Sequence, residues 1–341
     1  MRLLSIFIMA VCMLGGGMPV RADNLFQGKT IRIIIPTSVG GSYGVYAQLV
    51  SRHFGRHLPG NPAVITQAMP GAGGLVALNY LGSSAVPRDG SVITMAQVTL
   101  VQEALFNKDA HFEARDFKWI GRIDALSFLG VASKRSGITS LQDARMRDVI
   151  TGAPGLSNIP AQSPLVLNQI AGTRFKLISG YSGTGQVFLA LERGEVEFAV
   201  TSISAIKSLH ADAMRKGELV PVFAHAGRRL SDYSEVPILS EFANNEVERK
   251  FLRVFSITSD IGRSLAAPPG TPDGTVEVFR TAYRALVKDA TFLAEAAKLD
   301  VDLDRMEGDE LGRLVAEAMN ISPADRAEMG RFYEDLFGSL K

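Results

Sequence analysis

Apolar runs and amphipathic segments alternate along the first part of the chain. Ile31 to Ile35 is a β-branched apolar run, and the segment after it places Tyr46, Val50, Phe54 and Leu58 at four-residue spacing. A short β-branched run is typical of a buried strand, and apolar residues four apart lie on one face of a helix. The pattern predicts a strand, a loop and an amphipathic helix in that order.

The same unit recurs further along the chain. We predict the next strands over residues 63–67, 91–97, 128–132, 149–151, 175–178, 196–200 and 219–224. Helical spacing follows several of them, and residues 273–288 carry a further amphipathic helix. Because strands that alternate with helices form a parallel sheet with helices on both faces, the pattern predicts an α/β fold.

The length of the chain indicates two lobes, because 341 residues exceed what one hydrophobic core usually spans. We expect the chain to cross to the second lobe near residue 125 and to return near residue 245. The first lobe then contains residues 23–125 plus 246–341, and the second contains residues 126–245. The two crossings form a two-strand hinge in this prediction.

The first 22 residues have the pattern of an export signal. Arg2 is basic, Leu3 to Leu14 is apolar except for one serine, and Gly15 to Pro19 ends the apolar run. The run is shorter than the ~20 residues that a bilayer span requires, which disfavours the alternative of an uncleaved anchor. Small residues at Val20 and Ala22 favour cleavage after Ala22.

The composition of the chain excludes several classes of function. The single cysteine, Cys12, lies within the signal, so the exported chain has neither a disulfide nor a cysteine metal site. Loss of Arg2 and Arg21 with the signal changes the formal charge from +1 to −1. A chain of nearly zero net charge without a dense Lys/Arg cluster has no electrostatic footprint for nucleic acid.

Four loops carry the candidate chemistry, because each follows a predicted strand and precedes a predicted helix. They span residues 36–42, 69–74, 152–158 and 179–185. A helix start presents unpaired backbone N–H groups, and glycine lets an anion approach them closely. Glycine-rich turns also serve simply to reverse the chain, which remains the alternative for any single loop. The candidate amide and hydroxyl donors are Thr37, Ser38, Gly40, Gly41, Ser42, Gly71, Gly73, Gly74, Ser157, Ser182 and Thr184.

Two aromatic residues adjoin these loops. Tyr43 follows the first loop and Tyr181 lies within the fourth. Either ring could contact an apolar part of a ligand, and packing in the core is the alternative.

No histidine lies in a recognisable catalytic pattern. His53 and His57 are four residues apart, but no carboxylate lies between them as in a metalloprotease helix, and a solvated helix face explains them. His111, His210 and His225 are isolated, and no Gly-x-Ser-x-Gly motif accompanies them.

Two charged clusters have simple explanations. Asp300, Asp302 and Asp304 alternate like the start of a calcium loop but lack its glycine and its glutamate, so we expect a solvated edge. Arg228 and Arg229 form a pair that we expect to be solvated, although it could steer an anion. The sequence therefore predicts no catalytic residue, no metal and no cofactor.

Several motifs resemble those of the solute receptors of tripartite tricarboxylate transporters, the Bug-type receptors. The most specific are residues 36–42, Pro70 to Gly74 and Pro87 to Gly90, and weaker matches are Gly194 to Glu197 and Ala267 to Pro272. The resemblance extends over nearly all of the chain after the signal. It implies a two-lobed periplasmic binding protein of the type II-like fold.

The resemblance also implies a function. A receptor of this kind closes on a small organic carboxylate and delivers it to integral membrane transporter subunits, and we expect it to act as a monomer in the periplasm. Carried over by motif, the binding positions are Thr37, Ser38, Val39, Gly40, Gly41, Ser42, Gly71, Ala72, Gly73, Ala153, Pro154, Gly155, Ser157, Ser182, Gly183 and Thr184, beside Tyr43, Tyr181 and Thr201.

Two departures from the family pattern bear on the ligand. Relatives usually have an acidic residue where Gly44 stands and another where Thr201 stands. Because a carboxylate would pair with a ligand ammonium, we expect a ligand without an amino group. The alternatives are a ligand-sensing module for a membrane signalling protein and an exported hydrolase that uses a serine of these loops.

Overall fold

The computed structural model describes residues 25–337, apart from residues 38, 41, 156–157 and 182. The predicted export signal, residues 1–22, lies outside the described residues. Among the helices that are described, none combines the length and the apolar character that a membrane crossing requires.

The first sheet is assembled from two distant parts of the chain. Within the described residues it has six strands in the order β11-β4-β10-β3-β1-β2. β1 is parallel to β2 and β3, whereas β10 is antiparallel to β3 and β4. The strands are β1 (Thr30–Ile35), β2 (Ala63–Ala68), β3 (Val92–Met95), β4 (Lys118–Asp124), β10 (Arg263–Ala267) and β11 (Met306–Glu307).

Both faces of this sheet are buried, which explains the uninterrupted apolar run of β1. Ile31, Ile33 and Ile35 pack in one hydrophobic cluster, and Ile34 packs in another. Because successive side chains of a strand point to opposite faces, a strand covered on both sides has no polar alternation. The covering helices are α1 (Ser42–Phe54), α10 (Asp273–Leu286) and α11 (Ala290–Lys298) on one face, and α2 (Leu75–Gly82), α3 (Leu100–Phe106), α9 (Glu246–Ile261) and α12 (Gly308–Ala318) on the other.

The second sheet comes from the middle of the chain. Within the described residues it has five strands in the order β7-β6-β8-β5-β9, with β6 parallel to β7 and β8 and with β5 antiparallel to β8 and β9. The predicted two-lobed α/β fold is confirmed. The elements are β5 (Phe128–Ser133), α4 (Leu141–Met146), β6 (Val149–Ala153), α5 (Ile159–Ala171), β7 (Phe175–Ser179), α6 (Thr184–Arg193), β8 (Phe198–Ser202), α7 (Ile203–Leu209), α8 (Ala211–Arg215) and β9 (Leu219–His225).

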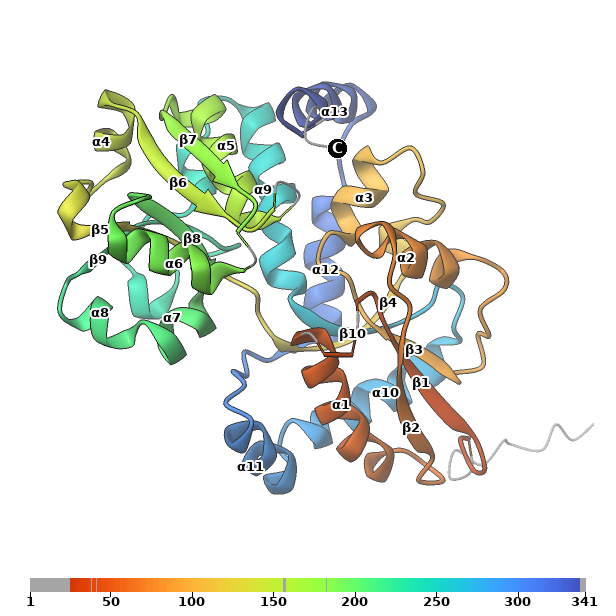
Figure 1. Ribbon diagram of the computed structural model, residues 1–341. Coiled ribbons are helices and arrows are strands. Elements are labelled where there is room, and N and C mark those ends of the chain that lie inside the picture. The colour runs from red at the N-terminus through yellow and green to blue at the C-terminus, as the bar shows by residue number, and fades with distance from the viewer. Residues whose placement is uncertain (1–24, 38, 41, 156–157, 182, 338–341) are drawn as a thin grey trace, which may run out of the picture.

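The chain crosses between the two sheets twice, as Figure 1 shows. The first crossing is the extended segment 125–127 between β4 and β5, and the backbone N–H of Leu126 donates to the carbonyl of Ser259 in α9 at 3.1 Å. The second crossing is α9 itself, so it is helical, whereas a second strand was expected. Gly262 ends α9 with a φ of 47°, and a Cβ there would lie 2.2 Å from the carbonyl oxygen of Asp124. The close approach of the two crossings therefore requires glycine.

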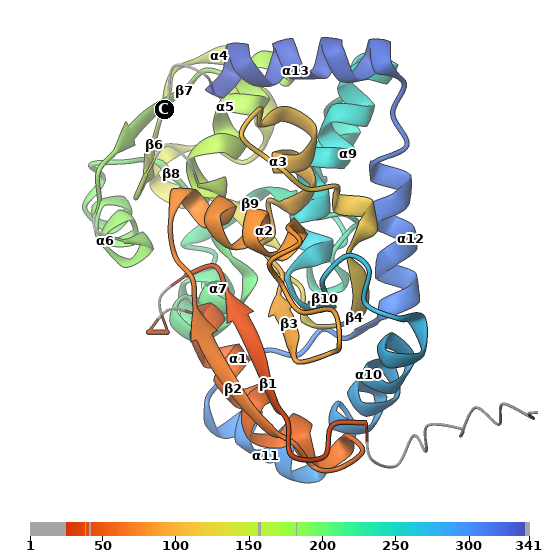
Figure 2. The same cartoon turned by 90° about the vertical axis from the view of Figure 1, so that its right-hand side faces the viewer.

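The last helix, α13 (Pro323–Phe337), contacts both lobes. It packs on α3 and α9 and also on α5 of the second lobe, and Figure 2 shows it running across the top of these helices. Met329 of α13 is fully buried, and Lys250 Nζ of α9 lies 2.5 Å from Asp325 Oδ2 of α13. α13 thus adds a third connection between the lobes besides the two crossings.

His225 ends β9 beside the second crossing and is fully buried. Its Nε2 lies 2.9 Å from Thr258 Oγ1 of α9, and its Nδ1 lies 3.1 Å from Ser163 Oγ of α5. The Thr258 hydroxyl donates to the carbonyl of Phe255, so it accepts from Nε2, which leaves Nδ1 to accept from Ser163. The expectation that His225 is isolated was wrong. Burial lowers the pKa of this imidazole to about 3, so it is neutral at physiological pH.

The free energy of unfolding should fall as the pH drops below about 6.5, in part because of His225. The unfolded chain binds this proton near pH 6.5, whereas the folded chain binds it only near pH 3, so stability is lost between these values. The loss from this group is at most about 1.4 kcal/mol per pH unit. Urea unfolding of His225→Gln should show a shallower pH dependence over this range. The exposed His111, replaced by Gln, is the control that should keep the wild-type dependence, and equal slopes in all three proteins would contradict the assignment.

Candidate functional site

A cavity of about 550 Å³ lies between the lobes. Its size is within the range of small-molecule sites in proteins. The first lobe contributes the segment after β3 and the start of β10, and the second contributes the starts of α5 and α6 and the end of β8. The described lining residues are Gln97, Val98, Thr99, Leu126, Phe128, Pro154, Asn158, Ile159, Pro160, Gln162, Thr184, Thr201, Ser202, Ser204 and Arg263.

The described lining mixes apolar residues with polar ones and contains no carboxylate. Its polar groups are hydroxyls and side-chain amides, together with the guanidinium of Arg263. Hydroxyl, amide and guanidinium groups all donate hydrogen bonds, whereas a lining carboxylate would repel an anion. The cavity is therefore suited to an anion and unsuited to a lone cation.

Two helices of the second lobe begin at this cavity. Asn158 caps α5, and its side chain accepts a hydrogen bond from the backbone N–H of Ala161 at 3.2 Å. Thr184 is the first residue of α6, and the preceding Gly183 gives no side-chain cap. The first turn of a helix carries unpaired N–H groups and a partial positive charge, worth about 0.3–1 kcal/mol to a nearby anion. The partial positive charge of both helix starts favours an anion, whereas the unpaired N–H groups belong mainly to the uncapped α6, since Pro160 in α5 has no N–H.

The structure brings three of the predicted binding residues to this cavity, namely Pro154, Thr184 and Thr201. Ser38, Gly41, Ser157 and Ser182 lie outside the described residues. Ser42 opens α1 and Gly73 lies in the 3-10 turn Ala72–Gly74, but their surroundings are not part of the described structure. The other predicted positions do not line the cavity, and these are Thr37, Val39, Gly40, Tyr43, Gly71, Ala72, Ala153, Gly155, Tyr181 and Gly183.

Tyr43 is a packing residue of the first lobe. It is 9% exposed, and its hydroxyl oxygen accepts a hydrogen bond from the backbone N–H of Val98 at 3.1 Å. Burial raises the pKa of this phenol to about 12. The tyrosine holds the segment after β3, whose residues Gln97, Val98 and Thr99 line the cavity. Of the two interpretations of Tyr43, the structure supports core packing.

Gly44 allows the first glycine loop to fold back on α1. A Cβ at residue 44 would lie 1.9 Å from the carbonyl oxygen of Val39, so the loop occupies the space that a side chain would need. The path of the loop therefore requires glycine at residue 44.

Arg263 is a lining residue that sequence reasoning missed. It is the first residue of β10 and only 7% exposed. Its Nη1 donates to Asp124 Oδ2 at 2.8 Å, and its guanidinium carbon lies 4.5 Å from the centre of the Tyr46 ring. The Tyr46 hydroxyl in turn lies 3.1 Å from Asp124 Oδ2 and 2.9 Å from the carbonyl oxygen of Asp302. A lone arginine before the apolar Leu265–Ala267 is the signal in the sequence that marks it.

Asp124 is the anionic partner of Arg263 in the same buried cluster. Burial raises the pKa of the Asp124 carboxyl to about 7, although the nearby Arg263 acts to lower it. The carboxyl group is therefore partly protonated near neutral pH, so the net charge beside the cavity changes in this pH range.

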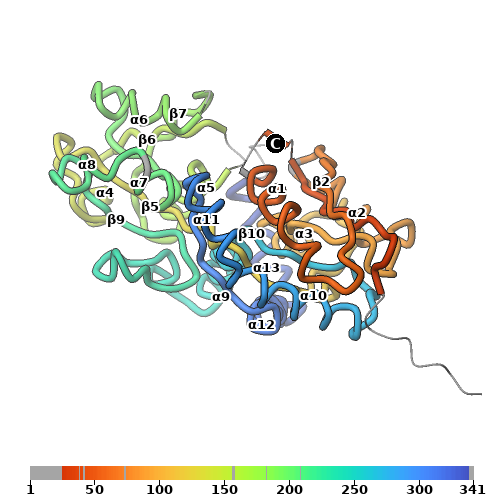
Figure 3. The backbone as a smooth tube through the Cα atoms, turned by 90° about the horizontal axis from the view of Figure 1, so that it is seen from below, coloured from red at the N-terminus to blue at the C-terminus, as the bar shows by residue number. Residues whose placement is uncertain are grey.

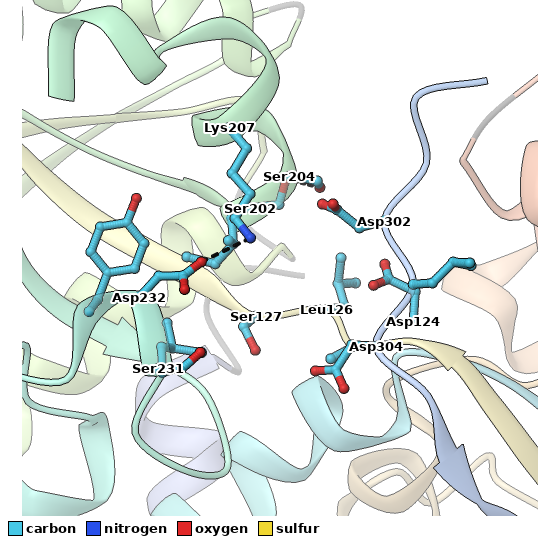
Figure 4. A pocket seen from close by; sticks show the side chains of 15 residues that line it. Asp124, Leu126, Ser127, Ser202, Ser204, Lys207, Ser231, Asp232, Asp302 and Asp304 are labelled. Atoms are coloured by element: carbon cyan, nitrogen blue, oxygen red, sulfur yellow. Dashed lines mark hydrogen bonds and ion pairs between the residues drawn. The ribbon is translucent and has the colours of Figure 1, made fainter. Parts of the chain in front are cut away.

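A second, smaller cavity of about 170 Å³ lies on the seam between the lobes and is shown in Figure 4. Asp124, Asp302 and Asp304 face it from the first lobe, and Lys207 and Asp232 face it from the second, where they pair at 3.0 Å. This surplus of negative charge makes it unsuited to a carboxylate.

The expectation of a solvated edge is wrong for Asp302 and Asp304. Asp304 Oδ1 accepts from the buried Arg122 at 3.0 Å and lies 3.9 Å from Arg228 of the second lobe. Both aspartates line the seam cavity, where their charges meet residues of the opposite lobe.

The expectation of a solvated face is also wrong for His53 and His57. His53 is 5% exposed, and its Nε2 lies 2.5 Å from Glu295 Oε2. His57 Nε2 lies 2.9 Å from Asp289 Oδ2. Both acids belong to α11 or its cap. His53 of α1 and His57 of the 3-10 turn after it therefore hold this part of the chain against α11, which lies beside α1 in Figure 3. No group of three or more potential metal ligands occurs among the described residues.

Comparisons with known proteins identify the architecture. A family model described as the tripartite tricarboxylate transporter family receptor matches residues 50–325. A TctC solute binding protein from Polaromonas is 19% identical, with a TM-score of 0.68 over 92% of this chain and 99% of that one. A protein of R. palustris with adipate is 17% identical, with a TM-score of 0.58 over 89% and 97% of the two chains. MatC of Rhodopseudomonas palustris with bound malate is 20% identical, with a TM-score of 0.56 over 90% and 99%. At these identities the three structures establish the fold.

Replacement of Gly44 by alanine should destabilise the first lobe. The added methyl group would overlap the carbonyl oxygen of Val39, and such overpacking typically lowers the free energy of unfolding by about 1–3 kcal/mol. Gly40→Ala in the same loop is the matched control, because a Cβ there meets no atom within 4 Å. Thermal unfolding should show a lower midpoint for Gly44→Ala alone. Equal midpoints for the two variants would contradict the described path of the loop.

Proposed function

The chain belongs to the tripartite tricarboxylate transporter receptor family, and we propose that it is a periplasmic receptor that captures a small organic carboxylate in the cavity between its lobes. In this proposal the receptor delivers the ligand to the integral membrane subunits of a transporter. The observation that carries the ligand class is the described cavity lining, which offers hydroxyls, amides and Arg263 but no carboxylate.

The helix starts in the second lobe support the same ligand class. α5 and α6 both begin at the cavity, so their partial positive charge would favour the ligand oxygens. The backbone N–H groups would come mainly from α6, because Pro160 of α5 has no N–H and the next two N–H groups are bonded to Asn158. The relatives with adipate and with malate hold small dicarboxylates, which agrees with this chemistry. Micromolar affinity corresponds to about −8 kcal/mol, which several such hydrogen bonds and modest apolar burial can supply.

Capture would occur by closure of the two lobes. A ligand that contacts both sides of the cavity binds the closed form more tightly than the open one and shifts the population toward it. We take residues 23–125 plus 246–341 as one lobe and residues 126–245 as the other, with segment 125–127 and α9 as the two connections that form the hinge. An export signal cleaved after Ala22 would release the receptor into the periplasm.

We propose that the chain has no catalytic activity of its own. Ser163 and His225 are within hydrogen-bonding distance, but both are fully buried in the second lobe, where no substrate can reach them. The serines and threonines that line the cavity have no histidine beside them in the described lining. A hydrolase needs a nucleophile and its base together at an accessible site.

Calorimetry with mono- and dicarboxylates, including adipate, succinate and malate, tests the proposed function. We expect wild-type protein to bind at least one of them and Thr184→Val to bind it roughly 2- to 10-fold more weakly, because one hydroxyl hydrogen bond is lost. Thr30→Val is the matched control, since Thr30 is an exposed residue of β1 away from the cavity. If wild-type protein binds none of these acids, the ligand class is wrong.

A further inference from the structure

We propose that Arg263 anchors one carboxylate of the ligand to the first lobe, so that the ligand is a dicarboxylate whose second carboxylate meets the helix starts of the second lobe. This inference rests on the proposed function, since it assumes that the cavity of about 550 Å³ receives the ligand.

Arg263 has N–H donors that its contacts with the described residues leave unused. Nη1 is used by Asp124, whereas Nε is buried and has no hydrogen-bond partner in the described structure. A buried charged donor without an acceptor is unfavourable, so a site that leaves one at a cavity wall is completed by an acceptor from outside. Arg263 lines the inter-lobe cavity, where a ligand carboxylate would supply that acceptor.

A second unused polar atom belongs to the same wall. Thr99 Oγ1 is buried without a hydrogen-bond partner, and Thr99 lines the same cavity. A hydroxyl can donate to a carboxylate oxygen, so a ligand at this wall would satisfy both groups. Thr99 follows β3, and Arg263 is the first residue of β10. Because these two strands are neighbours in the sheet, both groups belong to the same end of the first lobe.

The guanidinium is held in place before any ligand arrives. Asp124 on β4 fixes it from one side, and the ring of Tyr46 on α1 lies against it. The Tyr46 hydroxyl also contacts Asp124, so the three side chains form one buried cluster. A residue held in this way loses little conformational freedom on binding, which favours affinity.

The opposite wall explains why two carboxylates are needed. α5 and α6 begin at the cavity on the second-lobe side, and Thr184 and Thr201 add hydroxyls there. A monocarboxylate can satisfy either this wall or Arg263. A dicarboxylate satisfies both and thereby links the lobes, which is the differential contact that closure requires.

The charge of the cluster depends on pH. The groups that face Asp124 are Arg263 from β10, Tyr46 from α1, and Asp302 and Asp304 from the segment before β11. Because the pKa of Asp124 is raised to about 7, protonation below neutral pH leaves the positive charge of Arg263 uncompensated. An anion at Arg263 should then be attracted more strongly.

The first test uses adipate, succinate and malate, each compared with its monomethyl ester, by calorimetry on the full exported chain. We expect wild-type protein to bind at least one diacid at least tenfold more tightly than its ester, and Arg263→Lys to lose most of that difference. Arg280→Lys is the control. Like Arg263, Arg280 pairs with an aspartate of the first lobe, and it donates to a backbone carbonyl as well, but it does not line the cavity. Thr99→Val should also weaken diacid binding. It keeps the proposal testable if Arg263→Lys folds poorly.

The outcomes separate the two proposals. If wild-type protein binds a diacid but binds its ester equally well, or if Arg263→Lys keeps the wild-type difference, the role of Arg263 is wrong and the receptor function remains. If wild-type protein binds no carboxylate, the proposed function fails and this inference fails with it. A merely structural role of Arg263 would lower the melting temperature without changing the ratio of diacid to ester affinity.

A second test uses pH. Diacid affinity of the wild-type protein should be higher at pH 6.5 than at pH 8, and this dependence should disappear in Asp124→Asn, which keeps a hydrogen-bond partner for Arg263 but cannot titrate. Affinity that is independent of pH in the wild type would overturn the contribution of Asp124.

Discussion

The buried contact between Arg263 and Asp124 sets the charge beside the cavity that lies between the lobes. An anion loses its hydration when protein closes around it, so its charge must be matched by groups that are already in place. Arg263 of β10 meets that condition, because Asp124 of β4 and Tyr46 of α1 hold its guanidinium in place. The other described lining residues are apolar or uncharged polar residues, so Arg263 and its contact with Asp124 decide how strongly the wall attracts negative charge.

The same contact lies at the point where the lobes are joined. Asp124 ends β4, immediately before the first crossing, and Arg263 begins β10, immediately after the second. Gly262 lets the two crossings touch there, because a side chain at that position would overlap the carbonyl of Asp124. On the second-lobe side, His225 bonds α9 through Thr258. A ligand at Arg263 would therefore act on the residues around which the lobes turn.

Much of the fold follows from local patterns in the sequence. The β-branched run Ile31–Ile35 and the segment Val149–Thr151 are strands, and the Gly-rich segments after them lead into helices, as the spacing predicted. The return near residue 245 was expected, but its helical form was not, because residues 246–261 combine a charged beginning with apolar residues that suit either a helix or a buried strand. α9 is a helix because its apolar side chains pack on both lobes, which is a tertiary effect.

Less of the candidate site than of the fold could be predicted from the sequence. Pro154, Thr184 and Thr201 lie in segments with a clear strand-loop-helix pattern, and they line the cavity. Arg263 and Asp124 are 139 residues apart, and no local pattern links two residues at that separation. Their meeting depends on β10 pairing with β4 in an antiparallel register, which follows from the complete topology of the first sheet.

The crystal structure of the protein with a bound diacid such as adipate is the most direct measurement. The account predicts one carboxylate within hydrogen-bonding distance of Arg263 Nε and the other at the starts of α5 and α6. A ligand bound with both carboxylates on one lobe, or a carboxylate elsewhere with Arg263 Nε still unpaired, would contradict it.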